Sequence, residues 1–144
     1  GRIKYTTQPL VAIDDHNAPY YYHQAIDFKN QGTFESTVGR SLQAAISNGP
    51  AMVEQRTNVL NTGILDTKQA TVKSYRGAFG WKGTTYYLMV VRGATVTDSA
   101  AVMTALGMDY AINLDGGGST ALYTNGHYVI GPGRNLPNAI VVKP

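Results

Sequence analysis

The residues best suited to chemistry lie in one stretch, 110–123, where an apolar run ends at Asp115 and three glycines follow. Adjacent glycines lose much backbone entropy on folding, so they are used where φ must be positive or where a ligand approaches the main chain. Successive amides in such a loop can form an anion-binding nest. With the hydroxyls of Ser119 and Thr120 nearby, the stretch is suited to a phosphate or a polyhydroxylated ring. The alternative is a plain hairpin turn, because Asp-Gly is a common turn signal.

A resemblance favours the functional interpretation. The motif Asn113-Leu-Asp-Gly-Gly-Gly-Ser-Thr120 resembles the signature of the phosphodiester glycosidase family. The segment 72–81 resembles a family strand on which an arginine faces the site, which implies a role for Arg76. The closing segment with Arg134 and Asn138 also resembles the end of the family domain. Without the resemblance, Arg76 would be read as a surface arginine on an edge strand, and Arg134 and Asn138 as parts of a surface loop.

The resemblance implies hydrolysis of a sugar-1-phosphodiester, with a phosphorylated glycan or cell-surface carbohydrate as the partner. Catalysis would rest on Asp115, as base, nucleophile or acceptor from a ring hydroxyl, and on Arg76, whose planar guanidinium suits phosphate oxygens. The implied substrate-binding residues are Asn113, Gly116, Gly117, Gly118, Ser119, Thr120, Arg134 and Asn138. Because a phosphomonoester is a good leaving group, one carboxylate can nearly suffice.

A second carboxylate and a metal ion stay open at this point. Asp14, Asp15 and Glu54 are the candidates for a second carboxylate, whose separation from Asp115 would decide inversion or retention. Asp14, Asp15 and His16 are also potential metal ligands, although such a cluster is more often a solvated turn. A divalent cation bridging Asp115 and the phosphate is compatible with the site, but no spaced ligand set requires it.

The elements that position these residues indicate an α+β fold, with a mixed, largely β sheet, two main helices and a C-terminal hairpin. Expected strands cover residues 3–5, 10–13, 20–28, 49–53, 72–81, 84–91, 110–114 and 139–142. We expect 84–91 to be a central strand and 57–69 to be a loop. Helices are expected at 38–47 and from the cap Thr97 to Leu106, and a hairpin turns at Asn125-Gly126. If the second helix is a crossover, the strands beside it run parallel.

Composition narrows the function classes. With 144 residues, 43% of them hydrophobic and 15% charged, the chain suits one globular domain over 1–144. Its net charge of +3 is scattered, so we expect no nucleic-acid partner, and no apolar stretch is long enough to span a membrane. The absence of cysteine excludes disulfides and thiolate chemistry. The 10 tyrosines and 16 glycines fit an exported surface protein, so we expect an extracellular or cell-surface location.

The beginning of the chain weakens the resemblance. It opens at Gly1 without an initiator methionine, and the segment with which family domains usually begin is not found. We therefore expect a processed piece, completed by a cleaved N-terminal fragment or another chain. The alternative function is a non-catalytic, secreted carbohydrate-binding or surface-structural domain on the same scaffold, because fold alone does not decide function.

Overall fold

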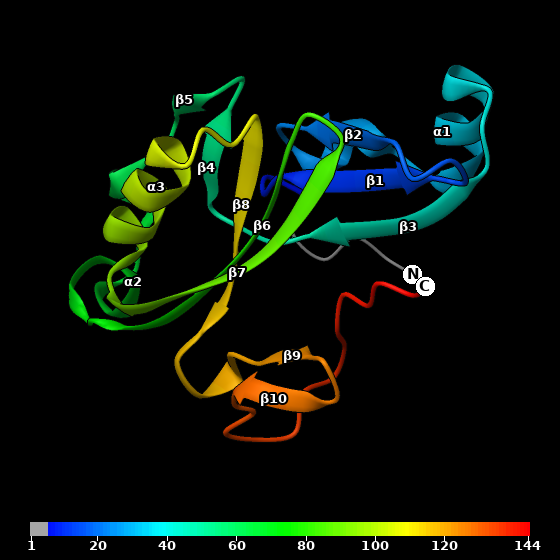
Figure 1. Ribbon diagram of the computed structural model, residues 1–144. Coiled ribbons are helices and arrows are strands. Elements are labelled where there is room, and N and C mark those ends of the chain that lie inside the picture. Colours follow the sequence, from blue (N-terminus) through cyan, green and yellow to red (C-terminus); the bar gives the residue numbers. More distant parts are fainter. Residues whose placement is uncertain (1–5) are drawn as a thin grey trace.

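The computed structural model describes residues 6–144, and its strands form three sheets within that part of the chain (Figure 1). The largest sheet has the order β5 (Thr57–Asn58), β4 (Ala51–Glu54), β8 (Tyr110–Gly116), β6 (Ser74–Lys82) and β7 (Thr85–Ala94). A three-stranded sheet has the order β2 (Pro19–Tyr22), β1 (Leu10–Asp14) and β3 (Leu42–Ser47). The predicted hairpin is confirmed as β9 (Leu122–Thr124) and β10 (His127–Ile130).

The helices are short and lie outside the sheets. They are α1 (Gln31–Val38), α2 (Thr67–Thr71) and α3 (Val96–Ala105), with the 3-10 turns η1 (Ala25–Phe28), η2 (Thr62–Ile64) and η3 (Gly117–Ser119). The α+β class expected from the sequence is confirmed. The described residues contain no helix that is both long and apolar enough to cross a membrane.

The predicted helix at 38–47 is wrong. The helix lies earlier, because the Asn30 side chain accepts a hydrogen bond from the Thr33 amide at its start and Gly39, with φ of 74°, ends it. Residues 42–47 instead form β3, antiparallel to β1. Leu42 and Ile46 are four residues apart, a spacing that fits both a helical face and one face of a strand. Pairing with β1 decides between the two.

The long strand β7 is not central, as we expected, but lies at an edge of the largest sheet. It pairs antiparallel with β6, and β6 pairs antiparallel with β8. The strands β7 and β8 therefore run parallel, with β6 between them, and α3 makes the crossover that the sequence predicted. The cap of α3 is Thr95 rather than Thr97, in a capping box with Asp98.

Other boundaries also differ from the predictions. The expected strand at 20–28 ends at Tyr22 and is followed by η1, the expected loop at 57–69 contains β5 and η2, and 139–142 is not a strand. The strand expected at 3–5 falls outside the described residues. From Gly131 onward the chain forms an irregular tail (residues 131–144) that returns toward β3 (Figure 1).

Two layers of the core lie on the two faces of the largest sheet, and a third cluster packs on the three-stranded sheet. Toward α3 lie Met52, Val53, Ala78, Ala100, Met103, Met108 and Ala111. The opposite face packs on the three-stranded sheet through Val11, Phe79, Trp81 and Ile112. Neighbouring residues of β8 point into different layers, as alternation along a strand requires. The two ends of β8 therefore reach two separate rims of the molecule, and each rim carries a pocket.

Candidate functional site

Asp115 lies near the end of β8, and its side chain is exposed. The Asn48 Nδ2 donates a hydrogen bond of 3.3 Å to Oδ1 of Asp115. Asn48 is itself oriented, because its Oδ1 accepts a 2.8 Å hydrogen bond from the Gly49 amide. This asparagine directly follows β3 and was not a predicted site residue. The only signal near it is the Gly-Pro step that comes next in the sequence.

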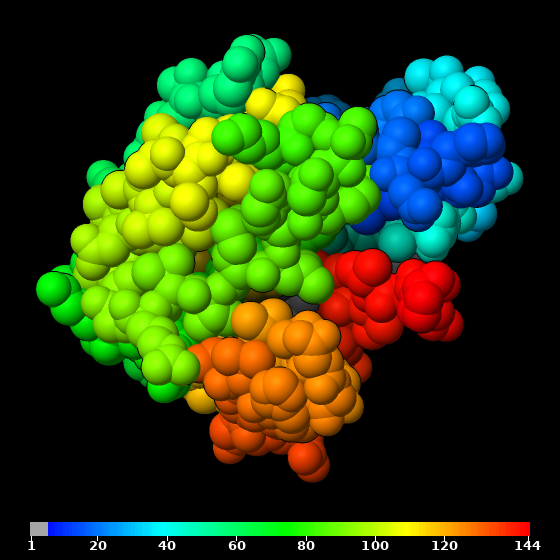
Figure 2. Space-filling view, viewed as in Figure 1, coloured from blue at the N-terminus to red at the C-terminus, as the bar shows by residue number. Residues whose placement is uncertain are grey.

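A groove of about 1250 Å³ opens beside Asp115. Strand β7, the hairpin β9–β10 and the tail supply most of its walls, and Figure 2 shows hairpin and tail lying against the strand. The predicted residues that line it are Asp115, Ser119, Thr120, Arg134 and Asn138. Among the described residues, Asp115 is the one carboxylate and Arg134 the one cation on the groove wall.

The three glycines differ in whether the fold requires them. A Cβ on Gly116 would lie 2.9 Å from the Tyr75 carbonyl oxygen, so packing against β6 requires a glycine there. Gly117 has φ of 59°, which other residues rarely adopt. Gly118 has neither constraint, because its φ is not positive and a Cβ would meet no atom within 4 Å. The fold therefore explains two of the three glycines and leaves Gly118 unexplained.

Thr120 closes the loop that these glycines form. Its amide donates a 3.0 Å hydrogen bond to the Gly117 carbonyl oxygen, and its hydroxyl donates a 3.4 Å bond to the Asp115 carbonyl oxygen. The side chain is buried although it borders the groove. Thr120 thus holds the shape of the loop below Asp115.

Arg76 is brought next to the loop, since β6 pairs it with Gly116. Its side chain, predicted to clamp a phosphate, is buried. Nε donates to the Ala94 carbonyl oxygen at 3.0 Å, and Nη2 donates to the carbonyl oxygens of Lys68 at 2.8 Å and Val72 at 2.6 Å. The third nitrogen, Nη1, lies toward Gly116, 3.0 Å from where its Cβ would be.

Asn113 is also buried, and its side chain makes a structural contact. Its Nδ2 donates a 3.1 Å hydrogen bond to the Gly49 carbonyl oxygen, and its amide donates a 3.0 Å bond to the Pro50 carbonyl oxygen. These bonds fix the segment that carries Asn48. Asn113 therefore positions the partner of Asp115.

The tail is joined to the glycine loop at several points. Arg134 Nη2 donates a hydrogen bond to the Ser119 hydroxyl, and the Gly133 amide donates a 3.2 Å bond to the Gly118 carbonyl oxygen. Gly131, with φ of 54°, packs so closely that a Cβ would lie 2.1 Å from the Thr120 carbonyl oxygen. Asn138 is exposed on the groove wall. The structure thus joins Arg134 to the loop and places Asn138 on the wall of the same groove.

Neither Glu54 nor Asp14 is close enough to act with Asp115. Glu54 is in register with Tyr110, five residues before Asp115 on β8, which corresponds to about 17 Å. Asp14 is in register with Leu42, at the end of β3 remote from Asn48, a similar distance. Paired glycosidase carboxylates lie about 5–9.5 Å apart. Both candidates are therefore wrong as partners of Asp115.

The cluster of Asp14, Asp15 and His16 forms a turn. Asp14 accepts hydrogen bonds from the Ala18 and His16 amides at 2.9 and 2.8 Å and from the Tyr20 hydroxyl at 3.0 Å. These bonds, led by the one from Ala18, lower the pKa of Asp14 below its ordinary value of 3.8. The three side chains lie close enough together to hold an ion. However, Arg40 Nη1 lies 2.7 and 2.6 Å from the two ring nitrogens of His16, and this cation disfavours a metal.

Comparison with known proteins identifies the family. The model of the phosphodiester glycosidase family matches residues 4–143 of this chain. The chain belongs to the phosphodiester glycosidase family. No curated protein matches it.

Two solved structures share the fold. One is the zebrafish N-acetylglucosamine-1-phosphodiester alpha-N-acetylglucosaminidase catalytic domain, auto-inhibited by its pro-peptide, with a TM-score of 0.64 and 21% identity over 86% of this chain. The other is a hypothetical protein from Synechocystis, with a TM-score of 0.53 and 19% identity over 89% of this chain. The chain spans 44% of the first and 32% of the second.

Proposed function

We propose that this chain hydrolyses sugar-1-phosphodiesters at the groove beside Asp115, releasing the sugar from the phosphate-linked remainder. One observation carries the proposal: a lone carboxylate and a cation border the same groove, and the glycine loop between the lining residues Asp115 and Ser119 has open space at the Cβ position of Gly118. Family membership supports the reaction class. The arrangement fits a substrate with an anomeric carbon beside Asp115 and a phosphate beside the glycine loop and Arg134.

The charges near the loop favour an anion. No carboxylate lies within 4 Å of the Arg76 guanidinium among the described residues, although this side chain is buried. Backbone carbonyls satisfy two of its nitrogens but do not neutralise its charge. Arg134 adds a second cation at the groove surface. The two arginines supply a positive potential at the glycine loop, where a phosphate would gain most from it.

The lone carboxylate restricts the mechanism. A general acid is needed when a sugar alkoxide leaves, because the alkoxide must be protonated. A phosphomonoester leaves as a stable anion and needs no such acid. Asp115 is then free to act on the anomeric carbon as nucleophile, or on a water as base, while the Asn48 amide holds its carboxylate. We therefore propose cleavage of sugar phosphodiesters and not of alkyl glycosides.

The test is hydrolysis of a panel of chromogenic sugar-1-phosphodiesters, with alkyl glycosides of the same sugars alongside. We expect the phosphodiesters alone to be cleaved, and Asp115→Asn to abolish turnover while its thermal unfolding stays close to that of the wild type. Asp15→Asn, an exposed carboxylate on the remote turn, is the matched control and should retain full activity.

Three results would contradict the proposal. Cleavage of alkyl glycosides at a comparable rate would require a general acid that the groove does not have. Turnover that survives in Asp115→Asn would place the chemistry elsewhere. Absence of turnover from this chain and from the longest form of the protein that contains it, with binding of the same sugars retained, would indicate a carbohydrate-binding domain instead.

A further inference from the structure

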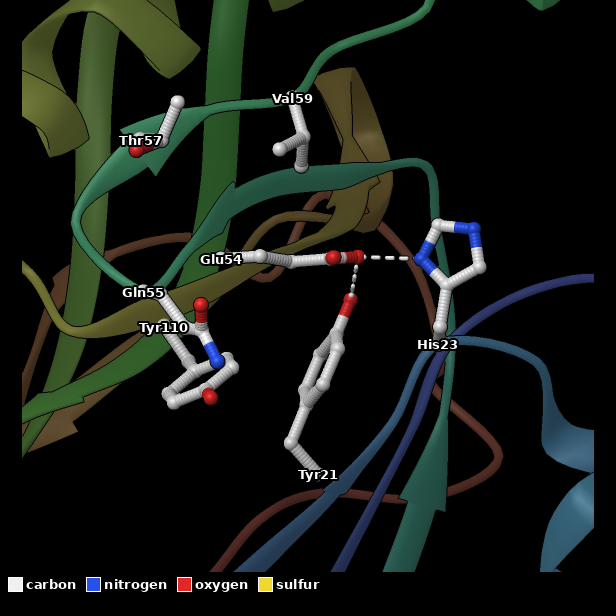
Figure 3. A pocket seen from close by; sticks show the side chains of 7 residues that line it. All are labelled: Tyr21, His23, Glu54, Gln55, Thr57, Val59 and Tyr110. Atoms are coloured by element: carbon white, nitrogen blue, oxygen red, sulfur yellow. Dashed lines mark hydrogen bonds and ion pairs between the residues drawn. The ribbon is translucent and has the colours of Figure 1, made fainter.

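A second pocket lies at the end of β8 opposite Asp115, between the largest sheet and β2 (Figure 3). Its volume is about 470 Å³, within the range of small-molecule sites. Its lining consists of Tyr21, His23, Glu54, Gln55, Thr57, Val59 and Tyr110. Because Glu54 is about 17 Å along β8 from Asp115, this pocket is separate from the groove.

Glu54 is the polar centre of this pocket. Its Oε1 accepts a 2.7 Å hydrogen bond from the Tyr21 hydroxyl and lies 2.5 Å from Nδ1 of His23, as Figure 3 shows. Burial and the bond to Glu54 raise the pKa of Tyr21, so this hydroxyl keeps its proton and remains a donor. Both contacts are to Oε1, and neither uses Oε2. The carboxylate is therefore held in one orientation while it retains acceptor capacity.

An aromatic wall adjoins this carboxylate. The ring centroids of Tyr21 and Tyr110 are 4.7 Å apart, and Tyr110 is stacked on Trp81 with its centroid 5.0 Å away. Trp81 itself is buried in the layer between the two sheets. Packing of this kind fixes the rings before any ligand arrives, which lowers the entropy cost of binding.

We propose that this pocket binds the ring of a neutral sugar. The Glu54 carboxylate, Gln55 amide and Thr57 hydroxyl offer acceptors and donors for ring hydroxyls, while the tyrosines offer an apolar surface for the C–H groups. No lysine or arginine is among the lining residues, so the pocket lacks what a phosphate needs. The site is distinct from the proposed catalytic groove and does not depend on the function proposed for it.

The sequence supplies a spectroscopic reporter, because Trp81 is the single tryptophan and stacks on Tyr110. We would titrate the whole chain with the methyl glycosides of glucose, galactose, mannose and N-acetylglucosamine and follow tryptophan fluorescence. At least one glycoside should produce a saturable change. Glu54→Gln should weaken that binding about tenfold, as expected for a lost hydrogen bond to a charged group. Thr57→Ala changes an exposed position and should also weaken the binding. It provides the test if Glu54→Gln fails to fold.

Two controls locate the signal. Asp115→Asn and Asp15→Asn should leave the titration unchanged, because neither residue lines this pocket. Absence of a response to all four glycosides would overturn the proposal. So would a response that survives in Glu54→Gln and Thr57→Ala but disappears in Asp115→Asn, which would place the sugar in the groove. A response to tetramethylammonium alone would show a cation site instead.

Discussion

The variant Gly118→Ala tests whether this glycine is required by the fold or by a bound ligand. The neighbouring glycines are fixed by the protein itself, Gly116 by its approach to β6 and Gly117 by its positive φ. At Gly118, which lies in the loop between the groove residues Asp115 and Ser119, a methyl group would enter open space. If the glycine is there for the fold, the substitution should harm stability. If it is there for a ligand, the substitution should harm binding alone.

The structure predicts opposite stability changes for two adjacent variants. Gly118→Ala should leave the free energy of unfolding unchanged or raise it by about 0.4–1 kcal/mol, because alanine restricts the unfolded chain and fits the native backbone. Gly117→Ala should lower it by about 1–2 kcal/mol, because alanine is strained at φ of 59°. Urea unfolding of the two proteins measures both changes.

Gly118→Ala should lower the activity although it does not lower the stability. A phosphate within hydrogen-bonding distance of the Gly118 backbone would be displaced by about 1 Å by a methyl group, and such a displacement can cost about 10²-fold in rate. We therefore expect Gly118→Ala to lower kcat/KM for a sugar-1-phosphodiester by about that factor in a protein that is as stable as the wild type. A variant with full activity would refute the reasoning, and so would a variant that is less stable than Gly117→Ala.

Three further predictions concern the stability of the folded protein. Arg76→Lys should lower the free energy of unfolding by about 3 kcal/mol, and Tm by about 10 °C, because one ammonium cannot replace the donors to three carbonyls. The control Arg134→Lys should change the free energy of unfolding by less than about 1 kcal/mol. Equal effects of the two substitutions would contradict a structural role for the buried Arg76. Gly131→Ala should lower the urea midpoint far more than Gly126→Ala, because both glycines have a positive φ but only a Cβ at Gly131 would clash with the Thr120 carbonyl oxygen. Similar midpoints would show that the tail moves away from Thr120 at little cost. The pKa of Asp14 is lowered in the folded state, so its carboxylate should contribute stability that is lost as the pH falls below 3.8. Asp14→Asn should therefore make the urea midpoint less dependent on pH in this acid range. An unchanged pH dependence would show that Asp14 makes no such contribution.

Much of the fold could be predicted because local signals were sufficient. The Asn125-Gly126 turn joins two short apolar runs, and the hairpin was found where expected. The helix α3 and the strand after it were also predicted, apart from the cap. The error at 38–47 arose because the apolar spacing there fits helix and strand alike, and only pairing with β1 decides. The edge position of β7 depends on sheet order, which a single strand does not encode.

The candidate site, too, could be predicted only in part from the sequence. Asp115 and its glycines are contiguous, so their motif could be read directly. Asn48 contacts Asp115 across 67 positions of the sequence, and no local pattern marks that contact. Glu54 and His23 meet across 31 positions, because the segment that follows β2 in one sheet reaches the end of β4 in the other. A sequence indicates residue types, whereas the register of distant strands determines which of them share a pocket.

Burial is the property of Arg76 that the sequence did not reveal, and it changes how the site would work. Its Nε and Nη2 already bind carbonyl oxygens, so Arg76 cannot present a two-pronged clamp to a phosphate without breaking those bonds. It can act through its charge and through Nη1. Direct contact then falls to Arg134, the cation on the groove wall, which binds Ser119 from the irregular tail. Tail and glycine loop must consequently keep their packing for the proposed anion site to exist.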